Sequence, residues 1–293
     1  MIFGEIESFF SLIERIYKPF KSKKEQEPLQ TELLSTRLVK AFEAHGVHRN
    51  QIPKVLGFEL TVNDVFSDEK FLSVLTEEVL DSACNLLGIK RDWLDGASKK
   101  IYETYDFYKH PYDFIDFIHQ LIERSGTDKI DGVLLTVRNS DRRSETLLII
   151  QEVIGHINDK PFYRYYLCNN WVFSYWKSRA YLTACVAVCW KNKIHVSGKY
   201  VTSSFIEKYA YGCNLLAFGS EGIYEINGNS WYAEDLALEP EAYLDGVDPE
   251  LENYGLKSAL SLWLQLNKQG LMDCGLPGIQ ASKKFEQELN CKV

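Results

Sequence analysis

The chain has 293 residues and a formal net charge of −8, and 45% of its residues are hydrophobic and 25% charged. This length allows one large domain or two ordinary ones, and the composition excludes a disordered or fibrous protein. The acidic balance is a poor electrostatic footprint for a nucleic-acid-binding protein, which needs a basic face.

The sequence also argues against two other classes of protein. No apolar run approaches the ~20 residues that a membrane-spanning helix requires, so no membrane span is predicted. The seven cysteines are odd in number and scattered along the chain, which indicates reduced thiols rather than a disulfide framework. These features predict a cytoplasmic protein.

Residues 1–30 are predicted to form an amphipathic helix and a linker. Apolar side chains recur at helical spacing from Phe3 to Phe20, and the stretch 21–28 contains no apolar residue. Such a helix has to bury its apolar face against the same chain, against a partner or on a membrane surface.

Residues 31–98 are predicted to form an all-helical bundle. Apolar side chains keep helical spacing through this stretch, and glycines mark tight turns. Thr61 is a suitable N-cap for a short third helix over 61–68. The first helix begins near Leu34 and ends at Gly46, the second carries Ile52 to Leu56, and a longer fourth helix runs from Phe71 to Gly88.

Residues 126–293 are predicted to form a mixed domain of sensor or effector type, reached through a helical connector over 99–125. Strands and helices mix here without strict alternation, so the predicted fold class is α+β. The apolar stretch Ala180–Trp190 favours a buried helix over a strand. The other predicted elements are strands at 132–137, 146–155 and 162–167, a hairpin turn at 158–161, a strand at 194–196, a helix from Thr202 or Ser203 to about Phe218, a hairpin joining 223–226 to 231–233, and a helix from Asp248 to Gly270.

Three segments of the predicted helical bundle have endings that follow one another in the order typical of a known family. Arg37–Val47 is a helix that ends in Gly-Val, Gln51–Gly57 ends in Leu-Gly, and Leu86–Leu94 reads Leu-Leu-Gly-Ile-Lys-Arg-Asp-Trp-Leu. Together they resemble the Cro/repressor-type (XRE-like) helix-turn-helix family over residues 33–96. The ending is the most specific match, because such domains often finish on Leu-Gly-Val, two variable residues and Asp-Trp-Leu.

This resemblance implies binding to double-stranded DNA, with the third helix in the major groove. On that basis Asn63 and Asp64 would contact base edges, and Arg49, Lys54 and Lys40 would contact phosphates.

The charge of the same region departs from the family pattern. The predicted third helix contains no Lys or Arg, and a stretch of like charge would repel a DNA duplex. Pro53 also predicts that the second helix begins late or is kinked. An alternative use of the unit is protein contact. Between Glu59 and Asp81 the chain has a single basic residue, Lys70, and seven acids: Glu59, Asp64, Asp68, Glu69, Glu77, Glu78 and Asp81.

An aromatic segment with interleaved cations, residues 162–179, is the candidate ligand site. Tyr163 and Tyr165 share one face of the predicted strand, and Arg164 and Tyr166 share the other. Such residues can hold a small planar or anionic ligand or stack bases, and core packing with the cations reaching to solvent is the favoured alternative. The candidate ligand-binding residues are Tyr163, Tyr165, Trp171, Trp176 and Arg179.

No catalytic residue, metal or cofactor is predicted. Cys185, Cys189, His195 and Cys213 match no zinc spacing, so the cysteines are interpreted as buried thiols. Glu152 is followed by Val153 and Ile154 rather than by the lysine of a restriction-type nuclease. The chain also lacks a phosphate-binding loop, a dinucleotide fingerprint and a Gly-x-Ser-x-Gly elbow.

The sequence therefore predicts a transcriptional regulator with a helix-turn-helix-like unit and a C-terminal domain that binds a small effector or forms a homodimer. One alternative is an adaptor protein that does not bind DNA. The other is an enzyme of unrecognised type in the C-terminal domain.

Overall fold

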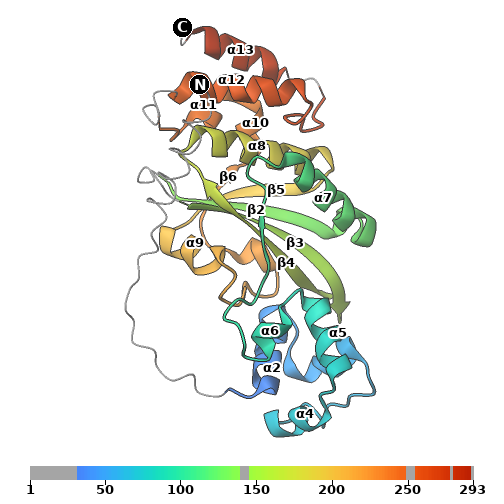
Figure 1. Ribbon diagram of the computed structural model, residues 1–293. Coiled ribbons are helices and arrows are strands. Elements are labelled where there is room, and N and C mark those ends of the chain that lie inside the picture. The colour runs from blue at the N-terminus through green and yellow to red at the C-terminus, as the bar shows by residue number, and fades with distance from the viewer. Residues whose placement is uncertain (1–31, 139–144, 249–254, 278–279, 292–293) are drawn as a thin grey trace, which may run out of the picture. The chain divides into compact units, whose positions relative to one another are not determined.

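A mixed six-stranded β-sheet organises the fold in the computed structural model, which describes residues 32–138, 145–248, 255–277 and 280–291 (Figure 1). The strand order is β1-β4-β3-β2-β5-β6; β1 pairs with β4 and β2 with β5 in parallel, and the other pairs are antiparallel. The predicted α+β class is confirmed. The strands are β1 (Thr104–Asp106), β2 (Ile130–Thr136), β3 (Glu145–Ile157), β4 (Lys160–Val172), β5 (His195–Tyr200) and β6 (Asn229–Tyr232).

The predicted hairpin between β3 and β4 is confirmed. Ile157 pairs with Lys160, so only Asn158 and Asp159 form the loop. Both have positive φ, 49° and 67°, as a two-residue hairpin turn of type I′ requires, and Asn and Asp tolerate this conformation better than most residues.

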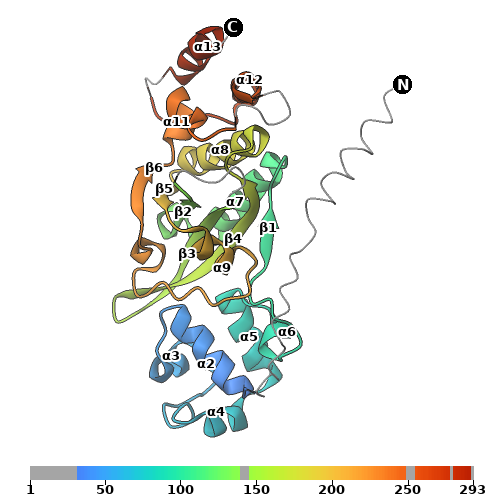
Figure 2. The same ribbon diagram turned by 90° about the vertical axis from the view of Figure 1, so that its left-hand side faces the viewer.

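The predicted buried helix at 180–190 is confirmed as part of α8 (Trp176–Lys191). One side of α8 packs with α7 (Pro111–Ser125) on the sheet, and the other side packs against the C-terminal helices. In both views α8 lies between the sheet and α12 (Figures 1 and 2). A helix covered on two sides is apolar all round, which explains the sequence. The C-terminal helices are α10 (Asp235–Leu238), α11 (Pro240–Leu244), α12 (Gly255–Lys268) and α13 (Ala281–Cys291).

Two predictions in the segment after β5 are wrong. Helix α9 (Ser203–Ala210), capped by the Thr202 hydroxyl, ends well before Phe218. The chain turns at Gly212, where φ is +69° and a Cβ would lie 2.7 Å from a backbone oxygen. The predicted hairpin 223–226/231–233 is replaced by the 3-10 helix η3 (Gly222–Glu225) and by β6, which pairs with β5 instead.

The N-terminal part of the described chain is helical, and its first two predicted helices are present. It packs at one end of the sheet (Figure 2). Its buried residues, such as Leu38 and Phe42, share one hydrophobic cluster with Val133 and Tyr165 of the sheet, so no break in the core marks residue 98. The helices are α2 (Leu34–Ala44), the 3-10 helix η1 (Arg49–Gln51), α3 (Ile52–Leu56), α4 (Asp68–Val74), α5 (Glu77–Leu87) and α6 (Arg91–Leu94).

The predicted third and fourth helices of this part need correction. Residues 61–67 form turns, because the Asp64 carboxylate accepts hydrogen bonds from the Thr61 amide at 2.8 Å and hydroxyl at 2.6 Å. Such local bonds compete with a helix. The single helix predicted from Phe71 is two helices, since the Thr76 hydroxyl caps α5 at the Val79 amide.

The amphipathic helix and linker predicted over 1–30 and residues 249–254 of the helix predicted from Asp248 lie outside the described residues. Among the described helices, none has both the length and the apolar composition needed to cross a bilayer.

Candidate functional site

The cations predicted to contact phosphates bind groups of the protein itself. Arg49 pairs with the Asp68 carboxylate and approaches the Val65 carbonyl at 3.4 Å. Lys54 donates to the Asn158 side chain at 3.3 Å. Lys40 lies on α2. The hydrogen bond from Thr36 and the Arg49 contact lower the pKa of Asp68, and the charge of Lys40 adds to this effect.

The predicted base-reading residues lie in the 61–67 turns rather than on a helix. Asn63 accepts a hydrogen bond from Lys70 at 2.9 Å. Asp64 is bonded to Thr61, and these bonds lower the pKa of its carboxyl. The structure therefore gives both side chains partners within their own segment.

The same segment exposes large apolar side chains, and we call residues 58–72 the apical surface. Phe66 is 74% exposed and Val62 is 57% exposed. Lys70 lies over the Phe66 ring at 5.5 Å. The other exposed apolar residues here are Phe58 and Leu72, and the acids are Glu59, Asp64, Asp68 and Glu69.

The five predicted ligand-binding residues are buried and do not converge. Tyr163 and Tyr165 belong to the cluster shared with the helical part, Trp171 to the cluster under α7 and α8, and Trp176 to the cluster of C-terminal helices. The buried Arg179 donates to the carbonyls of Phe173, Tyr243 and Asp245, and burial lowers its pKa to about 9. Core packing accounts for four of these residues, and Trp176 also lines a hollow between α8 and α12.

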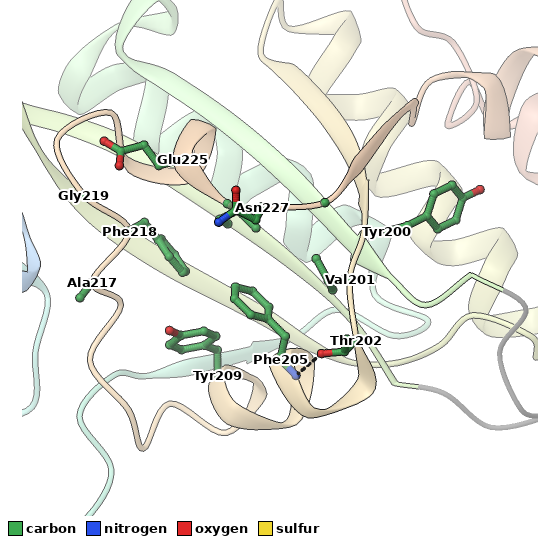
Figure 3. A pocket seen from close by; sticks show the side chains of 12 residues that line it. Tyr200, Val201, Thr202, Phe205, Tyr209, Ala217, Phe218, Gly219, Glu225 and Asn227 are labelled. Atoms are coloured by element: carbon green, nitrogen blue, oxygen red, sulfur yellow. Dashed lines mark hydrogen bonds between the residues drawn. The ribbon is translucent and has the colours of Figure 1, made fainter.

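A groove beside α9, with a volume of about 830 Å³, is a candidate ligand site. Phe205, Tyr209 and Phe218 form its aromatic wall, with the Tyr209 and Phe218 ring centroids 5.3 Å apart and edge to face. The three rings gather on one side, and the Asn227 amide projects toward the hollow (Figure 3). Glu225 is the one charged residue among those described as lining this α9 groove.

Sequence reasoning missed the α9 groove. The signal was the spacing of Phe205 and Tyr209, four residues apart after the Thr202 cap, which puts both rings on one helix face. The loop at 217–228 carries no comparable pattern. It is held by the Gln151 side chain, which accepts from the Ile223 amide at 2.8 Å, and by Glu225, which accepts from the Glu221 amide at 2.9 Å.

A buried hydrogen-bonded chain joins this loop to the helical part. The Leu216 amide donates to the Tyr102 hydroxyl at 3.2 Å, and that hydroxyl lies 3.0 Å from Nε2 of His45. Nδ1 of His45 lies 2.6 Å from the Tyr163 carbonyl. Burial lowers the pKa of His45 to about 4, so the ring is neutral at pH 7. Nδ1 is therefore the donor and Nε2 the acceptor.

A second buried group, Glu152, anchors helices to the sheet. Arg124 donates to both carboxylate oxygens, at 2.9 and 2.7 Å, and the Tyr166 hydroxyl donates at 2.6 Å. Burial opposes ionisation, but these bonds together lower the pKa of Glu152. Arg164 lies 3.8 Å away and also donates to the Leu86 carbonyl at the end of α5. The cluster fastens α7 and α5 to β3 and β4.

The cysteines are unreactive where they are buried. Burial raises the pKa of Cys168, Cys185 and Cys189, so these thiols stay protonated. His195 and Cys213 are exposed. Within the described ranges, no three His, Cys, Asp or Glu side chains gather in a way that would hold a metal ion.

No family model, curated protein or solved structure matches this chain. The helix-turn-helix resemblance therefore stays a prediction from three segments of the sequence.

Proposed function

We propose that this protein is an effector-responsive regulatory protein whose helical part acts by binding another protein. The apical surface supports this most directly. At the place where a helix-turn-helix unit presents a basic reading helix, this chain presents exposed apolar side chains among acids.

The charges of the apical surface disfavour DNA. Affinity for a duplex comes from cations that replace counterions at the phosphates. Arg49 would have to leave Asp68, and Lys54 would have to leave Asn158. Asp64 and Glu69 would meanwhile face the phosphates with negative charge.

The exposed apolar side chains and the acids of the apical surface define the kind of partner that it would bind. Exposed rings such as Phe66 supply anchors of the kind that dominate binding energy at protein interfaces. Acids around them favour a partner with Lys or Arg, because complementary charge speeds encounter and rejects acidic competitors. The partner is therefore a protein segment with apolar anchors flanked by basic side chains.

The α9 groove is the proposed effector site. Its volume lies within the range of small-molecule sites, and its aromatic wall suits an apolar planar ligand that hydrogen-bonds Asn227. Leu216 directly precedes the lining residue Ala217, so a ligand that shifts this loop would act on Tyr102 and His45. Coupling requires that the ligand bind two arrangements of the loop with different affinity.

The partner proposal can be tested by selecting displayed random peptides on the full-length chain. The double variant Val62→Ser/Phe66→Ser serves as the counter-target, since both side chains are exposed and the fold should survive. Peptides rich in apolar and basic residues should bind the natural chain only. Selection of the same peptides by both proteins would contradict the proposal.

A mobility-shift series on duplex DNA at increasing salt tests the transcription-factor alternative. The proposal expects no duplex binding at low salt. Steeply salt-dependent binding that Arg49→Ala and Lys54→Ala both weaken would instead support a DNA-binding regulator.

A further inference from the structure

A second hollow, of about 580 Å³, lies between α8 and α12. We call it the lysine groove, because Lys109, Lys177 and Lys257 line it. Lys109 comes from the segment before α7, Lys177 from α8 and Lys257 from α12. Three distant parts of the sequence thus bring positive charge to one place.

Helical spacing explains how α8 and α12 build this groove. Lys177 and Tyr181 are four residues apart on α8, and Lys257, Ser261 and Gln265 are spaced by four on α12. Residues at that spacing share a helix face. The neighbouring faces are apolar and pack the two helices together through the cluster that contains Ala180, Ala184, Leu260 and Trp263.

No acidic side chain among the described residues balances the charge of the lysine groove. The residues described as lining it include no Asp or Glu. Among the described residues, no carboxylate forms an ion pair with any of the three lysines. The ammonium groups of Lys109 and Lys177 instead lie over the rings of Tyr108 and Trp176, each at 4.9 Å. Cations that line one groove attract an anion to it, because their electrostatic potentials add.

We propose that the lysine groove binds a small, multiply phosphorylated molecule. Lysine ammonium groups act as mobile point charges toward phosphate. The hydroxyls of Ser258 and Ser261 can donate further hydrogen bonds, and Tyr181 and Leu262 offer an apolar wall for the uncharged part of the ligand. The proposal does not depend on the function of the apical surface or the α9 groove.

The test is calorimetric titration of the full-length chain with inorganic triphosphate at low and moderate salt. Binding should weaken as salt rises. Lys177→Gln and Lys257→Gln should each weaken it roughly two- to fivefold, as loss of one exposed charge contact implies, and the triple variant with Lys109→Gln should lose about tenfold or more. Lys129→Gln, which removes an exposed lysine outside the groove, is the matched control and should have no effect.

Other results of the titration would contradict the proposal in different ways. No binding by the natural chain at low salt would overturn the proposal, and so would an equal loss in Lys129→Gln, which would indicate unspecific attraction. Tighter, lysine-dependent binding of a short single-stranded DNA would assign the groove to a nucleic-acid backbone instead. Unchanged thermal melting of the variants would show that a loss of binding is not a loss of fold.

Discussion

The cations of the helical part and those of the lysine groove differ in what they contact. In the helical part, Arg49 is bound to Asp68, Lys54 to Asn158, and Arg91 to three carboxylates. In the lysine groove, Lys177 and Lys257 have no carboxylate partner among the described residues. A basic residue at a motif position therefore does not make an anion site unless its charge is available.

The largest expected effect is the dependence of the free energy of unfolding on pH, which is caused by the buried His45 in the helical part. The pKa of His45 falls from 6.5 to about 4 on folding, so the unfolded chain binds the extra proton between these values. Stability should be fully present above pH 6.5 and should fall by about 3 kcal/mol as the pH drops to 4. Denaturant unfolding at several pH values measures this slope.

The variant His45→Gln should flatten the pH slope, and the exposed His119→Gln should not. An unchanged slope in His45→Gln would mean that other groups cause the acid sensitivity.

The next effect concerns the Tyr102 hydroxyl, which joins the loop at 217–228 (the α9 loop) to the helical part. Tyr102→Phe leaves the Leu216 amide and Nε2 of His45 without that partner, which should cost about 1–3 kcal/mol. Hydrogen exchange should show faster opening of both the α9 loop and the end of α2. Faster exchange in the loop alone would argue against the hydrogen-bonded chain as a link.

A smaller effect is expected when the Arg49 charge is released. Asp68→Asn should destabilise the chain by roughly 1 kcal/mol, because the ion pair is partly exposed and Asn keeps some hydrogen bonding. If engagement of Arg49 is what prevents phosphate contact, the variant should also bind duplex DNA more strongly at low salt. If neither the stability nor the DNA binding of Asp68→Asn differs from that of the natural chain, the proposed difference between the cations of the helical part and those of the lysine groove is wrong.

The smallest effect belongs to the lysine groove. Lys177→Gln should leave the free energy of unfolding within about 0.5 kcal/mol of the natural value, since Lys177 forms no ion pair with any described residue. Its melting temperature should likewise stay close to that of the natural chain at low and at moderate salt. A marked loss of stability would show that Lys177 has a structural role.

Local signals in the sequence determined several elements correctly. Asn158-Asp159 between two alternating stretches predicts the β3–β4 hairpin, because few other residues accept positive φ at both positions. The apolar run in α8 predicts a buried helix, and its length excludes a short strand. The alternation of β4 predicts that Arg164 and Tyr166 share a face, and both lie within reach of Glu152.

Other features depended on distant parts of the chain. β1 has three residues and exists because it pairs with β4, about sixty positions later. The aromatic pattern of residues 162–179 is compatible with a ligand site and with a core, and only the layers packed on each face show which side chains are buried.

The cations predicted to contact DNA also show which features the sequence determines and which depend on the tertiary structure. The sequence by itself determined that Arg49 precedes the second helix, that Lys54 lies within it and that acids follow both. Only the tertiary structure decided that these acids and the β3–β4 turn lie close enough to bind both cations, and that three lysines from separate segments converge elsewhere. The physical reason is that charge pairing depends on distance in space, and local spacing gives that distance only within one helix or strand.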